Sequence, residues 1–217
     1  MGSLGVILGS GAAGLIPTHG DLVSIDRHGY PYVLPHAVDY AGNLKRLADQ
    51  GCDRVLGISS VGGLRPDLGP GTYVVPDDFI ALDLGPVTSM ETFEAHRVAR
   101  FDETWRREVV DALRAATEVE DGGVYWQVAG PRIETAAEVS LIAQHAHVVG
   151  MTVASECIIA CELGLPYAAM CVVDNLANGV TTQALTAEDV RAGQAEHRPE
   201  LAAVLGSALA TLAERSG

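Results

Sequence analysis

The sequence predicts a single α/β domain in which a mixed central β-sheet is flanked by helices. Short apolar runs alternate with longer amphipathic segments along the chain, which is the pattern of strands and helices that pack in layers. Of the 217 residues, 48% are hydrophobic and only 19% are charged, so the chain can bury one sizeable core and is not expected to be disordered. We therefore expect residues 1–217 to form one domain.

The elements expected in the first hundred residues lie between glycines and prolines. Pro35 stands at the start of a predicted helix with an apolar stripe, and Gly51 ends that helix. The segment 83–100 has mixed polarity and contains Gly85-Pro86, which predicts a loop. In order, we expect strands at 4–8, 22–25 and 32–34, a helix at 35–50, and strands at 54–61 and 73–80.

The second half of the chain alternates more regularly between strands and helices. Thr186 and Asp189 have the spacing of a capping box at the start of a C-terminal helix, which we expect to bend at Pro199. The other elements expected here are an amphipathic helix at 103–117, a strand at 123–128, a helix with Ser155 as its N-cap, and a continuation of the last helix to Leu212.

Three apolar runs in this half end in small or polar residues before a helical pattern begins. They lead to Glu134, Thr152 and Asn175. Because ligands of open α/β sheets bind at the carboxyl ends of the strands, we expect these three side chains at one rim of the sheet. An acid, a hydroxyl and an amide together can bind a polar heterocycle and an anion. On pattern alone, Glu134 is also suited to be a charge at the start of a helix.

The segment Gly9-Ser10-Gly11-Ala12-Ala13-Gly14 fits the Gly-x-Gly-x-x-Gly pattern of dinucleotide-binding folds. That fold needs a helix directly after the glycines, and the proline that follows here stops one after barely one turn. The segment is better interpreted as a loop whose N–H groups hold one phosphate, with a plain tight turn as the alternative. The pairs Arg27-His28 and Ser59-Ser60 suit an anion or a sugar, or else ordinary turns.

The composition limits the partners that we expect. A net charge of −14 argues against a nucleic acid or an anionic membrane as partner. The N-terminal residues do not have the pattern of a targeting signal, so we expect a cytoplasmic protein. The four cysteines lack the spacing of metal ligands, and we expect them to be small core side chains, with no metal site.

Several motifs taken together resemble the family of trimeric purine nucleoside phosphorylases and methylthioadenosine phosphorylases. They cover most of the chain up to about Asn178, and their order is more specific than any one of them. The motifs are Gly9-Ser10-Gly11, Arg27-His28-Gly29, the segments 38–44 and 59–64, Gly-Pro-x-x-Glu-Thr-x-x-Glu from Gly130, Gly150-Met151-Thr152, and Asn175 after a buried strand. The resemblance implies a homotrimer that uses phosphate to cleave a purine nucleoside, without a metal or an organic cofactor.

The resemblance also implies roles for individual residues. Glu134 would accept a hydrogen bond from the N1–H group of a 6-oxopurine, and Asn175 would contact N7 and O6 of the departing base. Phosphate would be held by five side chains from four segments, namely Ser10, Arg27, His28, Ser60 and Thr152. The other contacts to the purine or the ribose would come from Ser59, Val61, Ile133, Met151, Asp174 and Ala187.

Several features depart from the family pattern. Only the fifteen residues 12–26 separate the glycine loop from the Arg-His pair, so we expect a shortened N-terminal hairpin. Asp174 stands where threonine is common, and we expect it to orient Asn175 or to add a contact to the base. Ala187 stands where relatives that accept a 5′-hydroxyl carry histidine, which suits a 5′-deoxy or 5′-thio substituent at least as well. Phe93 and His96 are candidates for a loop that covers the 5′ end in a neighbouring subunit, with a solvated loop as the alternative.

The expected reaction is phosphorolysis, in which a purine nucleoside and phosphate give the free base and ribose 1-phosphate or its 5′-modified form. Phosphate is the nucleophile, so the rate would come from positioning and preorganised electrostatics. Glu134 and Asn175 together favour a 6-oxopurine without excluding adenine. One alternative is hydrolysis by a nucleosidase of the same fold, because a shortened hairpin could weaken phosphate binding. The other is a purine-binding protein without turnover.

Overall fold

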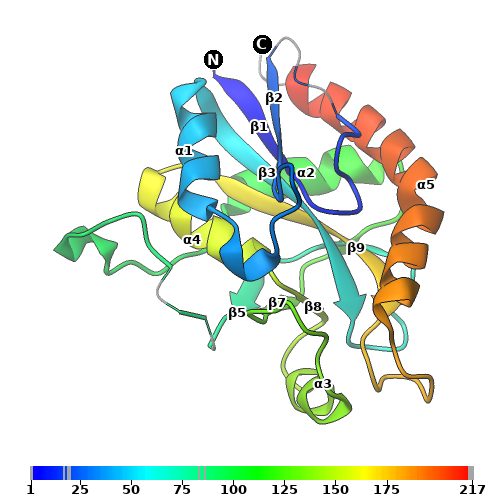
Figure 1. The fold of residues 1–217 in the computed structure, drawn as a ribbon. Coiled ribbons are helices and arrows are strands. Elements are labelled where there is room, and N and C mark those ends of the chain that lie inside the picture. Colours follow the sequence, from blue (N-terminus) through cyan, green and yellow to red (C-terminus); the bar gives the residue numbers. More distant parts are fainter. Residues whose placement is uncertain (1, 17, 19–20, 83, 86, 215–217) are drawn as a thin grey trace.

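The structure is a computed structural model that describes residues 2–16, 18, 21–82, 84–85 and 87–214. Within these ranges nine strands form one mixed β-sheet with helices on both faces (Figure 1), as the sequence predicts. The strands are β1 (Ser3–Leu8), β2 (Leu22–Asp26), β3 (Cys52–Gly63), β4 (Tyr73–Val75), β5 (Asp78–Ile80), β6 (Glu120–Asp121), β7 (Val124–Gln127), β8 (Val148–Gly150) and β9 (Tyr167–Leu176). Neighbouring strands follow the order β5-β7-β8-β3-β9-β4-β6, with β1 beside β3 and β2 beside β1.

The long strand β3 lies at the centre of the sheet. Its first half pairs in parallel with β1, and β9 runs parallel to it from Val55 to its end. At that end Gly62 and Gly63 pair with β8, which runs in the opposite direction. The carboxyl ends of β1, β3 and β9 therefore meet close to the place where β8 joins the sheet. This arrangement brings chain segments that are far apart in the sequence to one rim.

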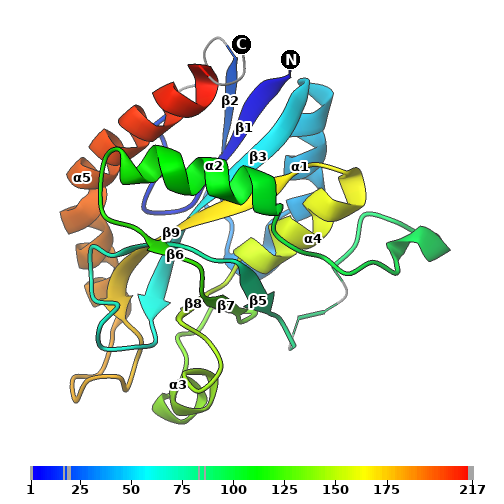
Figure 2. The ribbon, with the colours of Figure 1, turned by 180° about the vertical axis from the view of Figure 1, so that it is seen from behind.

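Helices cover both faces of the sheet (Figures 1 and 2). One face is covered by α1 and α4 and the other by α2 and α5, while α3 packs beside the end of β8. The helices are the 3-10 turns η1 (Pro35–Ala37) and η2 (Phe93–Ala95), and α1 (Tyr40–Asp49), α2 (Glu103–Arg114), α3 (Ala136–Ile142), α4 (Val153–Leu163) and α5 (Ala187–Glu214). In the described ranges, none of these helices has both the length and the apolar composition needed to cross a membrane.

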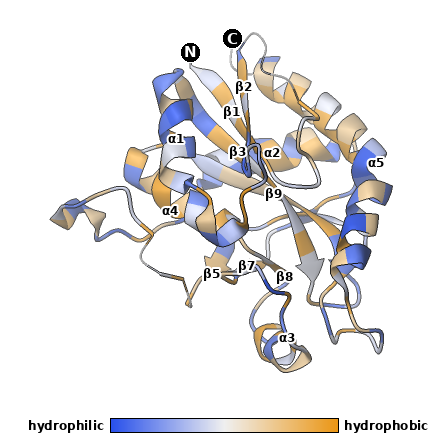
Figure 3. Ribbon diagram, in the orientation of Figure 1, coloured by the Kyte–Doolittle hydropathy of each residue, from blue (hydrophilic) through white to orange (hydrophobic). Residues whose placement is uncertain are grey.

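The C-terminal helix α5 has two unlike halves. Its buried residues all follow Pro199, and they pack with α2 into the core. The half before Pro199 is mostly hydrophilic (Figure 3) and lies near the carboxyl ends of the strands. The predicted cap is confirmed, because Thr186 N–H donates to Asp189 Oδ2 over 2.8 Å. The helix passes through Pro199 without an interruption, so one element packs on the core and also covers the rim.

Two predicted helix starts are wrong by a few residues. The helix expected from Pro35 begins at Tyr40, because the side chain of Asp39 accepts a hydrogen bond from the Gly42 N–H over 2.8 Å and caps it there. Only a single 3-10 turn precedes this cap. Ser155 lies inside α4 and does not cap it, since the helix already begins after Thr152.

Two predictions for strands need correction. The strand expected over 73–80 divides at Pro76, which has no N–H to donate, and its two parts join different neighbours. Residues 32–34 form no strand, and the Tyr32 side chain there is 56% exposed. Strands β1 and β2 run parallel to each other. The shortened N-terminal hairpin expected within residues 12–26 includes positions outside the described ranges and stays a prediction.

Candidate active site

A cavity of about 560 Å³ opens at the carboxyl ends of β1, β2, β3 and β9. Its size is that of a site for a small organic molecule. Every residue to which the sequence assigns a site role lies in its wall: Ser10, Arg27, His28, Ser59, Ser60, Val61, Ile133, Glu134, Met151, Thr152, Asp174, Asn175 and Ala187. The structure thus brings the predicted phosphate, purine and ribose residues together at one place.

The glycine-rich loop after β1 is held by α5. Gln194 Nε2 donates to Ser10 Oγ over 2.9 Å, and the Arg198 guanidinium donates to the carbonyl oxygens of Gly11 and Ala13 over 2.9 and 2.7 Å. A Cβ atom on Gly11 would lie only 2.7 Å from Ser60 Oγ, so the loop approaches β3 as closely as a residue without a side chain allows. The segment 10–16 forms turns and no helix, which excludes the dinucleotide-binding arrangement.

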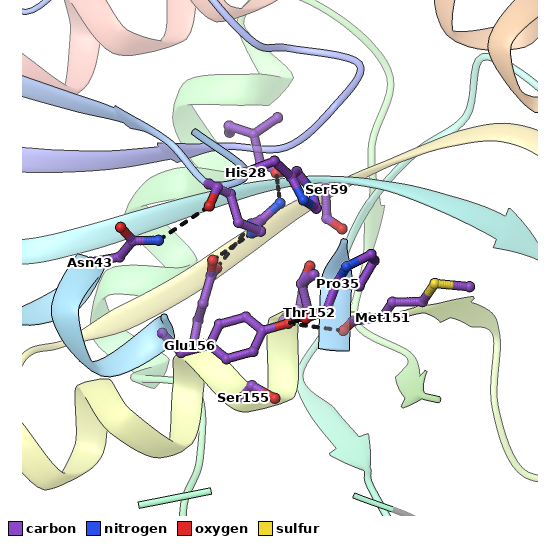
Figure 4. A network of polar contacts seen from close by, with 12 residues as sticks. His28, Pro35, Asn43, Ser59, Met151, Thr152, Ser155 and Glu156 are labelled. Atoms are coloured by element: carbon purple, nitrogen blue, oxygen red, sulfur yellow. Dashed lines mark hydrogen bonds and ion pairs between the residues drawn. The ribbon is translucent and has the colours of Figure 1, made fainter. Parts of the chain in front are cut away.

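Arg27 lines the cavity and forms a buried ion pair with Glu156, which is labelled in Figure 4. Its Nε and Nη2 atoms donate to the two carboxylate oxygens of Glu156 over 2.5 and 2.9 Å, and its Nη1 atom donates to Ile58 O over 3.0 Å. Tyr167 OH donates to Glu156 Oε2 over 2.6 Å. Both charged side chains are almost completely buried, at 1% and 0% exposure, so this bidentate pair fixes the guanidinium in one orientation.

This pairing changes what Arg27 can contribute to phosphate binding. Burial acts against its charged form, but the Glu156 carboxylate outweighs burial and holds the pKa of Arg27 above its ordinary value. The charge is therefore permanent and already neutralised by its partner. Two of the five guanidinium N–H groups are not used in the three bonds to Glu156 and Ile58. We expect Arg27 to act on phosphate as an oriented hydrogen-bond donor more than as a net positive charge.

His28 is a neutral group in this site. Its Nδ1 atom lies 2.7 Å from Val33 O and donates to it, and its ring stacks on Tyr32 with centroids 4.5 Å apart. Burial lowers the pKa of His28 below its ordinary value. With the proton on Nδ1, the Nε2 atom is an acceptor, so His28 can accept a hydrogen bond from a protonated phosphate oxygen or from a sugar hydroxyl.

The lowered pKa of His28 predicts a pH-dependent stability. The unfolded chain takes up a proton on this histidine below about pH 6.5, whereas the folded protein resists it, so the free energy of unfolding falls as the pH falls through that value. Urea unfolding at about pH 7.5 and about pH 5.5 should show a smaller difference for His28→Asn than for the wild type. Asp174, whose pKa is raised by burial, acts in both proteins and cancels in this comparison. Equal differences in the two proteins would contradict the assignment.

The partly buried Tyr40 and the fully buried Tyr125 shape the Met151-Thr152 corner of the cavity. Tyr40 OH donates to Pro35 O over 2.7 Å and approaches Met151 O at 3.3 Å. Tyr125 OH accepts from the N–H groups of Thr152 and Val153 at the start of α4, at 3.2 and 3.4 Å. The Thr152 side chain makes no capping bond to α4, so its hydroxyl stays available in the cavity wall.

Glu134 and Asn175 also line the cavity. Glu134 is buried and follows a cis peptide bond between Gly130 and Pro131. Asn178 Nδ2 donates to Glu134 O over 2.9 Å, which ties this loop to the chain that leaves β9. One N–H group of the Asn175 amide donates to Leu176 O over 3.0 Å. Its second N–H and its carbonyl oxygen remain for a ligand.

The sequence predictions missed three residues that organise the site. Glu156 orients Arg27, Asn178 holds the Glu134 loop, and Gln194 binds Ser10. A glutamate within the apolar segment 153–163 was the signal that could have pointed to Glu156. Gln194 has no local signal, because its bond joins residues 184 positions apart in the chain.

Phe93 and His96 do not reach the cavity of their own chain. They lie in a segment that projects from the body of the molecule (the green arm in Figure 1), and the Phe93 side chain is 82% exposed. The two rings contact each other, with centroids 4.8 Å apart. Their action in a neighbouring subunit stays a prediction.

The described residues bring together no group of three His, Cys, Asp or Glu side chains that could hold a metal ion. The polar groups of the cavity wall are instead those that bind organic molecules and anions: hydroxyls, two amides, two guanidinium groups, an imidazole and two carboxyls.

The fold and the site define a class of protein. The sequence profile of the Phosphorylase superfamily matches residues 9–210, and the chain belongs to this superfamily. This confirms the resemblance drawn from the sequence motifs.

Two related proteins and one solved structure are similar to the chain over most of its length. A probable 6-oxopurine nucleoside phosphorylase of Archaeoglobus fulgidus is 38% identical over 173 residues, which cover 78% of this chain and 71% of that protein. A probable S-methyl-5′-thioinosine phosphorylase of Methanothermobacter thermautotrophicus is 33% identical over 181 residues, which cover 82% of this chain and 64% of that protein. The solved structure of methylthioadenosine phosphorylase from Schistosoma mansoni with adenine has a TM-score of 0.82 and 21% identity, covering 98% of this chain and 92% of that one. This last likeness concerns the fold.

Proposed function

We propose that the protein catalyses the phosphorolysis of a purine nucleoside, giving the free base and ribose 1-phosphate or its 5′-modified form. The observation that carries this proposal is a single cavity in which an acid and an amide suited to a purine lie near hydroxyls and a guanidinium suited to phosphate. The relatives support it, since those of Archaeoglobus and Methanothermobacter are named as phosphorylases of 6-oxopurine and methylthioinosine nucleosides.

Phosphate binds at the end of the cavity formed by the glycine loop, β3 and the start of α4. The hydroxyls of Ser10, Ser60 and Thr152 and the free N–H groups of Arg27 donate to its oxygens, and His28 Nε2 accepts from its hydroxyl. The bound phosphate then attacks C1′ of the ribose while the bond to the base breaks. Its negative charge stabilises the positive charge that develops on the sugar.

The base binds at the end formed by Glu134 and Asn175. A 6-oxopurine presents an N1–H donor to the Glu134 carboxylate and an O6 acceptor to the Asn175 amide. A 6-aminopurine presents N1 as an acceptor, which would face a carboxylate without a proton between them. An unpaired buried acceptor costs about 1–3 kcal/mol, so this pair of residues favours hypoxanthine and guanine as leaving groups.

The 5′ end of the nucleoside faces a small apolar wall formed by Leu185, Ala187 and Val190. Ala187 is the first residue of α5 and offers no hydrogen-bonding side chain to a 5′-hydroxyl. The wall therefore accommodates a 5′-methylthio group at least as well as a hydroxyl, and the proposed substrates include both inosine and methylthioinosine.

A panel of nucleosides tests this function. Inosine, guanosine, adenosine, methylthioinosine and methylthioadenosine are each incubated with the protein in the presence and absence of phosphate, and release of the base is measured. We expect release that requires phosphate and is fastest with inosine, guanosine or methylthioinosine. A preference for the adenine nucleosides would contradict the roles of Glu134 and Asn175, and release without phosphate would contradict phosphorolysis.

The proposal includes no metal or organic cofactor, with phosphate as the co-substrate. We therefore expect base release to be unchanged after dialysis against a chelator, and a loss that is restored by a divalent cation would contradict this. We also propose a role in purine salvage in the cytoplasm. The free thiols of Cys52, Cys157, Cys161 and Cys171 support such a reducing compartment.

We further propose that the protein assembles as a homotrimer through the projecting segment. Phe93 and Val98 of this segment are 82% and 89% exposed, and large exposed apolar side chains on one projecting segment suit a contact with another subunit. Light scattering should give the mass of a trimer for the wild type and a smaller mass for Phe93→Glu. Leu141→Glu on α3 is the matched control, because Leu141 is also exposed but lies outside the arm. An unchanged mass for Phe93→Glu would contradict this role of the arm.

A further inference from the structure

A second acid in the cavity wall has no role in the mechanism above. The side chain of Asp174 is 4% exposed, and within the described residues its Oδ2 atom has no hydrogen-bond partner. Its nearest ionisable neighbour is His197 on α5, whose Nδ1 atom lies 3.8 Å from Oδ1 and is also buried without a partner. Buried polar atoms normally find partners, so an unpartnered carboxyl oxygen in the cavity wall, close to an unpartnered imidazole nitrogen behind it, indicates a function that involves a ligand or a proton.

A β-bulge places this carboxyl in the cavity wall. Val61 pairs with Val173 and Gly62 pairs with Asn175, which leaves Asp174 as an extra residue between the two pairs. The consecutive residues Asp174 and Asn175 can therefore both line the cavity, although neighbouring residues of a regular strand point to opposite faces.

The position of Asp174 connects the two ends of the cavity. On one side, a Cβ atom built on Gly11 of the glycine loop would lie 3.9 Å from Asp174 Oδ2. The hydroxyl of Ser60 lies on the same side and is close to the carboxyl. The next residue along the chain is Asn175, which is assigned to the base and lines the same cavity. Asp174 is thus close to groups assigned to phosphate and is the chain neighbour of the residue assigned to the purine.

The proposed reaction must move one proton between these ends. Hydrogen phosphate dianion loses its proton when one of its oxygens bonds to C1′, and the purine, which leaves with the electrons of the C–N bond, gains one at a ring nitrogen. Phosphate loses one proton and the purine gains one, so the reaction needs no oxidant, reductant or further reactant.

We propose that Asp174 carries this proton, with His197 as the residue that positions its carboxyl. In its acid form Asp174 donates a proton to the departing purine as the C–N bond breaks. As the new C–O bond forms, the phosphate proton leaves its hydrogen bond to His28 Nε2 and passes to the Asp174 carboxylate, and the acid form is restored. The inference rests on the proposed function, since it assigns a group to a proton that only phosphorolysis moves in this way.

The surroundings favour the acid form of Asp174. Burial is the main cause that raises its pKa above the ordinary value, while Ser60, His197 and Gln194 lower it by less. The groups that face the Asp174 carboxyl are Ser60 on β3, Gln194 and His197 on α5, and Tyr73 on β4. Tyr73 is also close to Glu200. A phosphate dianion bound beside the carboxyl would raise the pKa further, because like charges disfavour ionisation.

A pair of substrates separates proton delivery from every other role of Asp174. Inosine leaves as an anion that must be protonated, whereas 7-methylguanosine carries a positive charge on its imidazole ring and leaves as a neutral base. We expect Asp174→Asn, which keeps the size and loses the proton, to lower kcat for inosine by about 100-fold or more. With 7-methylguanosine we expect a decrease of less than about 5-fold, since the general-acid contribution is not needed there.

His197→Gln tests the positioning role and keeps the inference testable if Asp174→Asn folds poorly. We expect about a 10-fold lower kcat with inosine and little change with 7-methylguanosine, because the carboxyl is present but less well placed. An equal loss with both substrates in either variant would overturn the inference, as would an undiminished rate with inosine. Failure of the proposed function would be seen separately, as wild-type release of base from inosine that does not require phosphate.

Discussion

Glu156→Gln is expected to lower the free energy of unfolding by about 3–5 kcal/mol, because it leaves the buried charge of Arg27 without its counter-ion. Arg27 and Glu156 are 1% and 0% exposed and form two hydrogen bonds to each other, so water cannot replace the lost carboxylate. The same substitution also weakens the acceptor of the Tyr167 hydroxyl. Three elements, β2, α4 and β9, are joined at this one carboxylate, which explains why a single change is expected to have such a large effect.

Urea unfolding monitored by circular dichroism measures this effect. Asp67→Asn is the matched control, because Asp67 also pairs with an arginine, Arg65, but both side chains of that pair are largely exposed. We expect no measurable change for the control, since exposed ion pairs contribute little. If Glu156→Gln unfolded at the same urea concentration as the wild type, the buried pair would not have the structural role described here.

Glu134→Gln is expected to lower kcat/KM for inosine by about 10- to 100-fold and to leave cleavage of adenosine unchanged or faster. The carboxylate accepts the N1–H of a 6-oxopurine through a charge-assisted bond, which a neutral amide replaces with a weaker one. The amide can also turn an N–H group toward N1 of adenine, where the carboxylate has none to offer. The selectivity between the two nucleosides should therefore fall more than the activity toward either one.

Initial rates with inosine and adenosine at saturating phosphate measure this selectivity. Glu103→Gln on α2 is the control, since it changes the same residue type on the outer face of the molecule, away from the cavity. An equal decrease in the rates with both nucleosides would show that Glu134 supports the structure of the loop and does not distinguish between the bases.

Elements that are determined by nearby residues could be predicted from the sequence, whereas elements that depend on distant contacts could not. β1, β9 and α2 follow from apolar runs and amphipathic spacing and lie close to where the sequence places them. The strand expected over 73–80 divides because its two parts find different neighbours in the sheet, which no local pattern specifies. The start of α1 at Tyr40 depends on a cap formed by Asp39, a local signal that Pro35 obscured.

The candidate site also has residues that the sequence could predict and residues that it could not. The residues to which the resemblance assigns contacts with phosphate, purine or ribose all line one cavity, because the carboxyl ends of the strands meet at one rim, as the fold class predicts. The groups that hold them there were not predictable in the same way. Arg27 and Glu156 are 129 positions apart in the chain, and their pairing appears only when the turn after β2 and helix α4 come together in the fold. The direction of Asp174 depends on a bulge that arises from the register of β3 and β9.

The most direct test of the account is the fate of the phosphate oxygens. The protein is incubated with inosine and phosphate labelled with oxygen-18, and the sugar product is analysed by mass spectrometry. If phosphate is the nucleophile, the product is ribose 1-phosphate that keeps all the labelled oxygens, one of which now bridges to C1′. Free ribose together with unchanged labelled phosphate would show that water attacks C1′, and the site would then be that of a nucleosidase.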